Sequence, residues 1–176
     1  MNERLSGFYE LYLRRRSIRE FSGRDIEEDV LRRLLEVLRM AQSAANRQPW
    51  HFIVVRDEQR EAFNEVFTKD GFKAAPVLIV ACAEPERAWE RKPDGRNYAW
   101  VDVTIAVTEM IGAATAEGVG SCWVAAIEPL KVKELLGIPD KIDVVGVIAM
   151  GYPNEELRQI EKDRWPLEKI VHYGKW

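Results

Sequence analysis

Four arginines and a serine lie within a short segment near the start of the chain, at Arg14, Arg15, Arg16, Ser17 and Arg19. Each guanidinium group stays charged at any relevant pH and can hold two phosphate oxygens through parallel N–H bonds. The serine adds a hydroxyl and a backbone N–H. The pattern indicates an anion-binding site. The alternative is a solvated basic end of a helix, where the helix dipole favours positive charge.

A second group of polar residues, Ser43, Asn46 and Gln48, lies in a loop that we expect over residues 42–49. Amide side chains both donate and accept hydrogen bonds, which suits the edge of a heterocyclic ring or a row of hydroxyl groups. Ser and Asn are also common turn formers, so ordinary turn chemistry is the alternative. The loop alone does not decide between the two.

Two later segments offer complementary groups. Ala125, Ala126 and Ile127 lie at the end of an expected strand, and the small side chains of the two alanines let another group approach the backbone closely. A buried strand would use the same small residues for packing. Near the C-terminus, Lys162 and Arg164 bring two more positive charges. Their alternative is an ordinary pair of solvated tail charges.

The elements that must position these groups follow from the apolar periodicity of the chain. Asp25 and Glu28 form a plausible capping box before a helix that runs to residue 41. Residues 85–96 are charged and contain Pro and Gly, which predicts a mobile surface segment. The apolar tail over 155–176 must pack on something, and a partner subunit is the natural candidate. We further expect helices over 4–15, 57–67, 97–117 and 129–136, and strands over 51–55, 77–83, 120–127 and 142–150.

Composition narrows the possible classes of protein. The chain has 176 residues, which predicts a single domain over 1–176, and its net charge of −3 gives no general attraction to nucleic acid. The longest continuous apolar stretch, 76–83, is too short to cross a membrane. The start of the chain lacks the apolar region of a secretory signal, so we expect a cytoplasmic protein. Cys82 and Cys122 form no CxxC pair, which favours buried thiols and gives no support for a metal site.

Taken together, three segments resemble the FMN-contacting motifs of the nitroreductase family, in the same order along the chain. This resemblance implies an α+β fold with a central, mostly antiparallel sheet flanked by helices. It also implies a homodimer with FMN at the subunit interface and a C-terminal extension exchanged between the subunits. The three segments are Arg15-Arg16-Ser17-Ile18-Arg19, Asn46-Arg47-Gln48-Pro49-Trp50 and Gly118-Val119-Gly120-Ser121-Cys122-Trp123.

The resemblance also assigns roles to the residues introduced above. The first segment would hold the phosphate and the ribityl chain, with Arg19 near the pyrimidine edge of the flavin, and the loop of Ser43 and Asn46 would reach the FMN of the other subunit. Lys162 and Arg164 would close over the phosphate. The complete set of expected cofactor contacts is Arg15, Arg16, Ser17, Arg19, Ser43, Asn46, Gln48, Ala125, Ala126, Ile127, Lys162 and Arg164.

The reaction implied by the resemblance is electron transfer from NAD(P)H through bound FMN to a small acceptor such as a nitro-aromatic compound or a quinone, in ping-pong order. Flavin N5 would carry the chemistry, so no protein side chain is expected to be catalytic. The alternatives are reductive dehalogenation, flavin fragmentation or deazaflavin metabolism on the same fold, or a flavin-binding dimer without turnover. Asn64, Lys69 and Lys73 are candidate flavin contacts without a matching motif, and Asp102 is a possible buried carboxylate.

Overall fold

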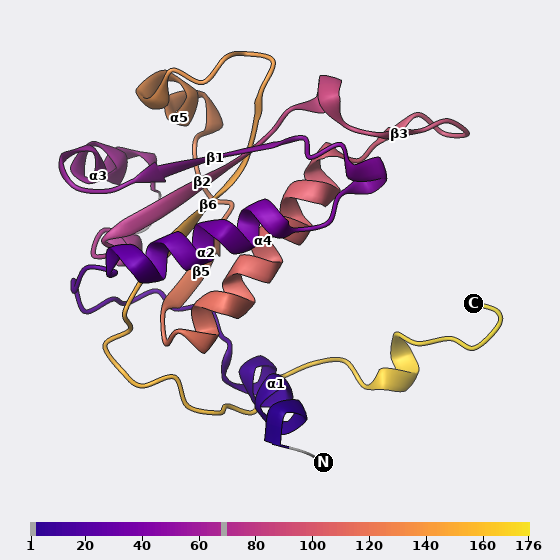
Figure 1. Cartoon of the computed structure of the whole chain (residues 1–176), viewed down its shortest axis with the longest axis horizontal. Helices are drawn as coiled ribbons and strands as arrows, with labels where there is room; N and C mark the ends of the chain where they lie inside the picture. Colours follow the sequence, from indigo (N-terminus) through magenta and orange to yellow (C-terminus); the bar gives the residue numbers. More distant parts are fainter. Residues whose placement is uncertain (1–2, 68–69) are drawn as a thin grey trace.

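The computed structural model describes residues 3–67 and 70–176. Its helices and strands follow the order expected from the apolar pattern (Figure 1). The α-helices are α1 (Glu3–Arg14), α2 (Glu28–Met40), α3 (Glu58–Ala62), α4 (Ala99–Ala116) and α5 (Pro129–Leu136). The strands are β1 (Trp50–Val55), β2 (Val77–Ala83), β3 (Glu90–Arg91), β4 (Arg96–Asn97), β5 (Gly120–Val124) and β6 (Asp143–Gly151).

Four of the strands form one antiparallel sheet in the order β1-β2-β6-β5. The register pairs Trp50 with Ala83 across β1 and β2, and Gly120 with Gly151 across β5 and β6. Strands β1 and β5 are therefore the two edges. Together with the flanking helices this confirms the expected α+β class with a mostly antiparallel sheet.

Both faces of the sheet are covered, which explains why all of β2 is buried. Alternate side chains of a strand point to opposite faces. Val77 and Ile79 face α2 and α4, whereas Leu78 and Val80 face α5 and the apolar residues that follow α3, such as Phe63. Figure 1 shows α2 and α4 together on one face. The result is a three-layer arrangement with an apolar core on each side of the sheet.

A β-bulge in β6 changes which side chains face which layer. Ala81 pairs with Gly146, but the next residue, Cys82, pairs with Val144. Val145 and Val147 consequently pack in different cores, although they are two positions apart. Glycine is required at 146, because a Cβ there would lie 2.7 Å from Nε1 of the Trp123 side chain. The absence of a side chain at Gly146 therefore leaves room for the Trp123 side chain of β5.

The capping box expected for Asp25 and Glu28 is wrong. Helix α2 begins at Glu28 after Glu27, and no side chain caps its first turn. The carboxylate of Glu27 instead accepts hydrogen bonds from Arg24 and Tyr152, and Glu28 pairs with Arg56 at 2.7 Å. Glu28, the second member of the expected box, thus pairs with a residue distant in the sequence and does not cap the helix.

Three other expected elements differ from the structure. The helix expected over 57–67 ends as α3 at Ala62 and continues as a 3₁₀-helix over Phe63–Val66. The segment 85–96 lies at the surface as expected, and it also contains pairing that the sequence did not predict, because β3 and β4 form a hairpin in which Arg91 contacts Asp94 and the Tyr98 hydroxyl. The strand expected over 120–127 ends at Val124, so residues 125–127 lie beyond the sheet.

Helix α4 is long and apolar enough to cross a membrane by length and composition alone. Within the fold, one side of it packs on the sheet through Val103, Ala106 and Met110, all fully buried, and Asp102 is buried beside them. These core contacts account for the apolar character of that side.

Gly120 keeps the start of β5 close to the arginine-rich segment, which generates a testable prediction. A Cβ at 120 would lie 2.9 Å from Cγ1 of Ile18. We expect Gly120→Ala to lower the free energy of unfolding by about 1–3 kcal/mol, the usual cost of overpacking. Urea denaturation measures the change.

The control is the double variant Ile18→Ala/Gly120→Ala, in which the two Cγ atoms of Ile18 are absent. Its loss of stability should be smaller than the sum of the two single losses, because two of the three close contacts are removed and only the Cβ of residue 18, at 3.0 Å, remains. Additive losses would show that Ile18 is not what Gly120 makes room for.

Candidate functional site

The arginine-rich segment is held at the edge of the sheet by backbone pairing. Ser17 forms a parallel bridge with Ser121, and the backbone N–H of Ile18 donates to the carbonyl of Ser121 at 2.9 Å. Ile18 itself is buried, so it anchors the segment while its neighbours stay accessible. The polar side chains from residue 15 to residue 19 are thus fixed beside the start of β5.

All five of the expected cationic cofactor contacts lie together in the structure. Arg15, Arg16 and Arg19 line one hollow of about 370 Å³ with Lys162 and Arg164 from the tail. The tail is tied to α1 at this point, because the ammonium group of Lys162 donates to the carbonyl of Tyr12. Residues nearly 150 positions apart in the sequence therefore share one basic site.

The electrostatics of this hollow fit an anion. Partial burial lowers the pKa of Lys162, and the nearby charges of Arg15 and Arg164 lower it further. Glu161 and Asp163 also line the hollow, but the cations outnumber them. Grouping like charges is unfavourable unless an anion offsets the repulsion, and a phosphate group does so through bidentate N–H bonds. Arg14 does not join this group, since its guanidinium lies 4.0 Å from Glu10.

The small residues after β5 lie at the other end of that strand. Ser121 marks the cationic end, and because a strand rises about 3.3 Å per residue, Ala125 lies roughly 13 Å further on. Ala125 and Ala126 are exposed, and the backbone N–H of Ile127 turns back to the carbonyl of Ala125 at 3.0 Å. An extended phosphorylated cofactor could span this distance with its ring against the small residues.

Described residues on either side of 68–69, between α3 and β2, lie near these two ends, which the sequence did not reveal. Phe67 bridges to Ile127, while Gly71 lies so close to Arg19 that a Cβ there would be 3.0 Å from the Arg19 carbonyl oxygen. Arg60, which is buried, holds the turn by donating to the carbonyls of Phe72 and, at 2.7 Å, Ala75. An arginine in a short amphipathic helix reads as solvent-exposed, so no pattern could have singled it out.

Asn64, Lys69 and Lys73 are the three candidate flavin contacts in this region, and the structure describes two of them. The side-chain oxygen of Asn64 accepts a hydrogen bond from Arg60 at 2.8 Å, so Asn64 belongs to the same anchor. Lys73 is exposed on the turn. Lys69 lies outside the residues that the structure describes.

The polar loop forms a compact unit of its own. The hydroxyl of Ser43 accepts the backbone N–H of Gln48 at 3.0 Å, and Nε2 of Gln48 donates to Oδ1 of Asn46 at 3.1 Å. The loop is fastened to the first turn of α4, where Asp102 accepts the backbone N–H of Ala44 at 2.9 Å. The expected buried carboxylate at 102 is confirmed, with 1% of the residue exposed.

One chain does not bring this loop to the cationic hollow. The loop contacts α4 at Asp102, whereas Arg15 lines a hollow whose other side includes Gly112 and Ala116 of α4. Because an α-helix rises about 1.5 Å per residue, these two points are roughly 15–21 Å apart along the axis. The cationic hollow and the polar loop, which carry most of the expected cofactor contacts, therefore lie apart in one chain.

Both cysteines are free and buried, as expected. Burial raises the pKa of Cys82 to about 11 and also raises the pKa of Cys122. Neither thiol is therefore ionised near neutral pH, which disfavours a nucleophilic or redox role.

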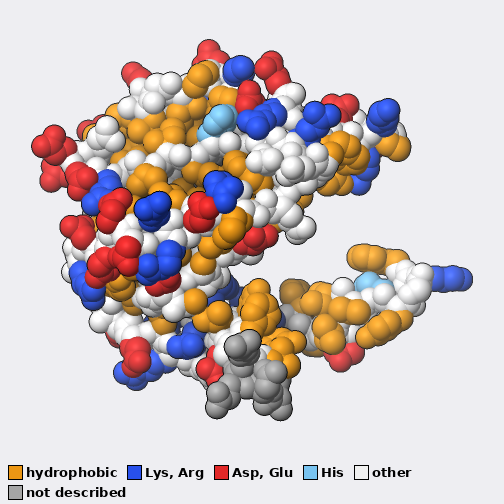
Figure 2. Space-filling model, in the orientation of Figure 1, with side chains coloured by type: hydrophobic (Ala, Val, Ile, Leu, Met, Phe, Trp, Pro, Cys, Tyr) orange, Lys and Arg blue, Asp and Glu red, His pale blue; other side chains and the backbone are white. Residues whose placement is uncertain are grey.

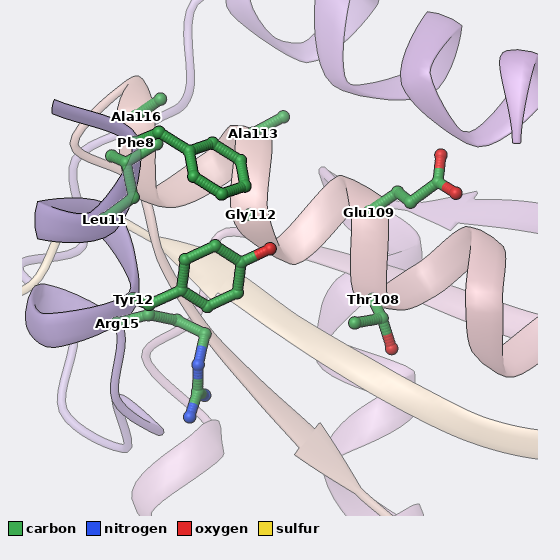
Figure 3. Close-up of a pocket in the computed structure, with 9 residues that line it drawn as sticks. All are labelled: Phe8, Leu11, Tyr12, Arg15, Thr108, Glu109, Gly112, Ala113 and Ala116. Atoms are coloured by element: carbon green, nitrogen blue, oxygen red, sulfur yellow. The ribbon is translucent and has the colours of Figure 1, made fainter. Parts of the chain in front are cut away.

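A large apolar surface lies beside the site. Figure 2 shows the tail extending from the body of the molecule with hydrophobic side chains along it. Trp165, Tyr173 and Trp176 are exposed by 69%, 91% and 103%. Next to the tail, α1 and α4 enclose a hollow of about 390 Å³ in which the rings of Phe8 and Tyr12 lie over α4 (Figure 3). Such an area of exposed aromatic side chains marks an interaction surface.

Comparison with known proteins accords with this geometry. The sequence matches the Nitroreductase family over residues 12–71 and 63–152. A protein of Archaeoglobus fulgidus with the provisional name NADH dehydrogenase/NAD(P)H nitroreductase is 38% identical, with 92% of this chain and 94% of the relative covered. The crystal structure of a nitroreductase family protein from Clostridium difficile is 30% identical with a TM-score of 0.88, each chain being covered completely. Another structure from that species, named an FMN-dependent nitroreductase, is 27% identical with a TM-score of 0.78 and covers 96% and 99% of the two chains. The chain therefore belongs to the nitroreductase family.

Proposed function

We propose that this chain is an FMN-dependent oxidoreductase that passes electrons from NAD(P)H to a small acceptor such as a nitro-aromatic compound or a quinone. The observation that carries the proposal is the basic hollow, which gathers the side chains of Arg15, Arg16, Arg19, Lys162 and Arg164. The exposed Ala125 and Ala126 lie about one strand length from this hollow. The surface thus offers one site for a phosphate group and another for a flat ring. The names of the relatives support the same cofactor and donor.

When bound, FMN supplies the redox chemistry, taking a hydride equivalent from NAD(P)H and passing electrons to the acceptor. The chain binds and orients it. Arg15, Arg16 and Lys162 would hold the phosphate, and the small, exposed side chain of Ala125 would let the ring lie close to the backbone. Arg19 provides a fixed positive charge near the pyrimidine edge, which favours the reduced, more negative form of the ring.

A homodimer completes the site in this proposal. The loop carrying Ser43, Asn46 and Gln48 would contact the FMN held by the other subunit, which explains why one chain keeps the two groups of contacts apart. The outer edge of β1 has no strand partner within the described ranges, and an extended tail can pair with such an edge. Exchange of the apolar tails would cover the side chains of Trp165, Tyr173 and Trp176.

The same proposal places the protein in the cytoplasm, where NAD(P)H is supplied. Cell fractionation with an antibody against the chain tests this location.

The visible absorption spectrum of the purified protein tests the proposed reaction. We expect a flavin spectrum that bleaches on addition of NADH or NADPH and recovers when a quinone or nitro-aromatic compound is added. Flavin that is reduced by dithionite but not by NAD(P)H would contradict the proposed donor and favour another reaction on this fold. Absence of flavin after incubation with FMN would contradict the cofactor.

Arg15→Ala tests the phosphate contact directly. We expect the affinity for FMN to fall by about 1.5–3 kcal/mol, the range for a hydrogen bond to a charged group. Quenching of flavin fluorescence during titration of the apoprotein measures it. The matched control is Arg39→Ala, since Arg39 is an exposed arginine that pairs with Glu36 on α2. Equal affinities of the Arg15 and Arg39 variants would remove Arg15 from the phosphate site.

Asn46→Ala tests the contribution of the loop across the interface. We expect the variant to remain a dimer but to lose flavin during size-exclusion chromatography followed at both protein and flavin absorbance. The reason is that the amide is proposed to bind the cofactor and not the partner chain. A monomeric variant would show that Asn46 instead holds the subunits together.

A further inference from the structure

The loop between α2 and β1 has an unfavourable backbone conformation. Ala45, Asn46 and Gln48 have φ angles of 50°, 54° and 50°, in the left-handed region that glycine prefers. Each such residue costs of the order of 1–3 kcal/mol, and asparagine tolerates the region better than alanine or glutamine. A loop of this kind persists only where surrounding contacts impose it.

Most of the contacts of the loop are local. Ser43 accepts hydrogen bonds from the backbone N–H groups of Asn46 at 3.0 Å and Gln48 at 3.0 Å, the first through its carbonyl and the second through its hydroxyl. These bonds move with the loop and cannot fix its place. At its far end, the carbonyl of Pro49 accepts the N–H of Glu84 as the sheet begins. At its near end, the fixed contact is between Ala44 and Asp102.

Burying the carboxylate of Asp102 at this position costs free energy of folding. This residue is 1% exposed, its Oδ1 accepts the N–H of Ala44, and its Oδ2 is buried with no hydrogen-bond partner among the residues that the structure describes. Burial raises the pKa of this carboxyl group, because the charged form loses its hydration. An apolar side chain would fill the same core space without that cost. We therefore attribute the carboxylate at this position to its hydrogen bond with the Ala44 N–H and not to the packing of α4.

We propose that Asp102 is a positioning residue for the cofactor: by fixing Ala44 it holds the strained loop so that Ser43, Asn46 and Gln48 present their polar groups to the flavin. The inference rests on the proposed function, in which this loop contacts FMN. It assigns Asp102 no contact with the flavin itself. The first turn of α4 thus sets the geometry of one half of the cofactor site.

Two substitutions of similar size separate the hydrogen bond from packing. Asp102→Asn keeps a side-chain oxygen that can accept the Ala44 N–H, whereas Asp102→Leu fills the space and removes the acceptor. By fluorescence titration of the apoprotein with FMN, we expect the Leu variant to bind at least tenfold more weakly than the wild type. The Asn variant should stay within threefold of it. Equal affinity of the Leu variant and the wild type, or equal losses in both variants, would overturn the proposal.

A double-variant cycle distinguishes positioning from general loss of structure. If Asp102 acts through the loop, Asp102→Leu should weaken FMN binding less in a chain that already carries Asn46→Ala than in the wild type, because one of the three loop contacts is already absent. The titration of that chain uses FMN concentrations high enough to saturate it. Full additivity of the two losses would mean that Asp102 acts independently of the loop, and would overturn the proposal.

Hydrogen exchange of the apoprotein makes the test independent of flavin. We expect the amide of Ala44 to exchange at least tenfold faster in the Leu variant than in the wild type, with protection restored in the Asn variant. This result would support the positioning role even if the wild type failed to bind FMN, which would count against the proposed function alone. Unchanged protection of Ala44 in the Leu variant would overturn the inference whatever the flavin does.

Discussion

The repulsion among clustered cations is the constraint on which the rest of this structure depends. Arg15, Arg16, Arg19, Lys162 and Arg164 converge on one hollow although like charges disfavour it. The fold supplies the compensating order: a backbone pairing to β5 fixes the first three, and a contact with the end of α1 fixes the tail. A phosphate group would turn this unfavourable arrangement into a set of charge-assisted hydrogen bonds. The sheet and its two apolar cores can be understood as the rigid support for that arrangement.

The second organising feature is α4, which separates the two groups of expected contacts. Its C-terminal half lines a hollow together with Arg15, and at its N-terminal end Asp102 holds the strained loop that contains Asn46. A helix of 18 residues is too rigid to bring these ends together. The proposed dimer resolves this separation, because the loop of one chain can meet the cationic hollow of the other. The exposed apolar tail and the open edge of β1 are consistent with the same assembly.

Much of this fold follows from the sequence. The buried strands read as continuous apolar runs, and α2 reads as a periodic one, since core burial imposes those patterns. The capping box at Asp25 failed because Glu27 and Glu28 found distant partners that local sequence cannot reveal. The five cations could be named individually from the motifs, but their convergence depends on the path of the tail. The role of Arg60 could not be predicted from the sequence, because no local pattern distinguishes an arginine that donates to buried backbone carbonyls from an exposed one.

The central claim is that the basic hollow binds the phosphate of a flavin mononucleotide. The most direct test compares the affinities of the apoprotein for FMN and for riboflavin, which has the same ring and ribityl chain but no phosphate. Two or more charge-assisted hydrogen bonds of about 1.5–3 kcal/mol each predict that FMN binds at least about a hundredfold more tightly. The difference should shrink as salt is raised, because exposed charges are screened. Equal affinities for FMN and riboflavin would contradict the account.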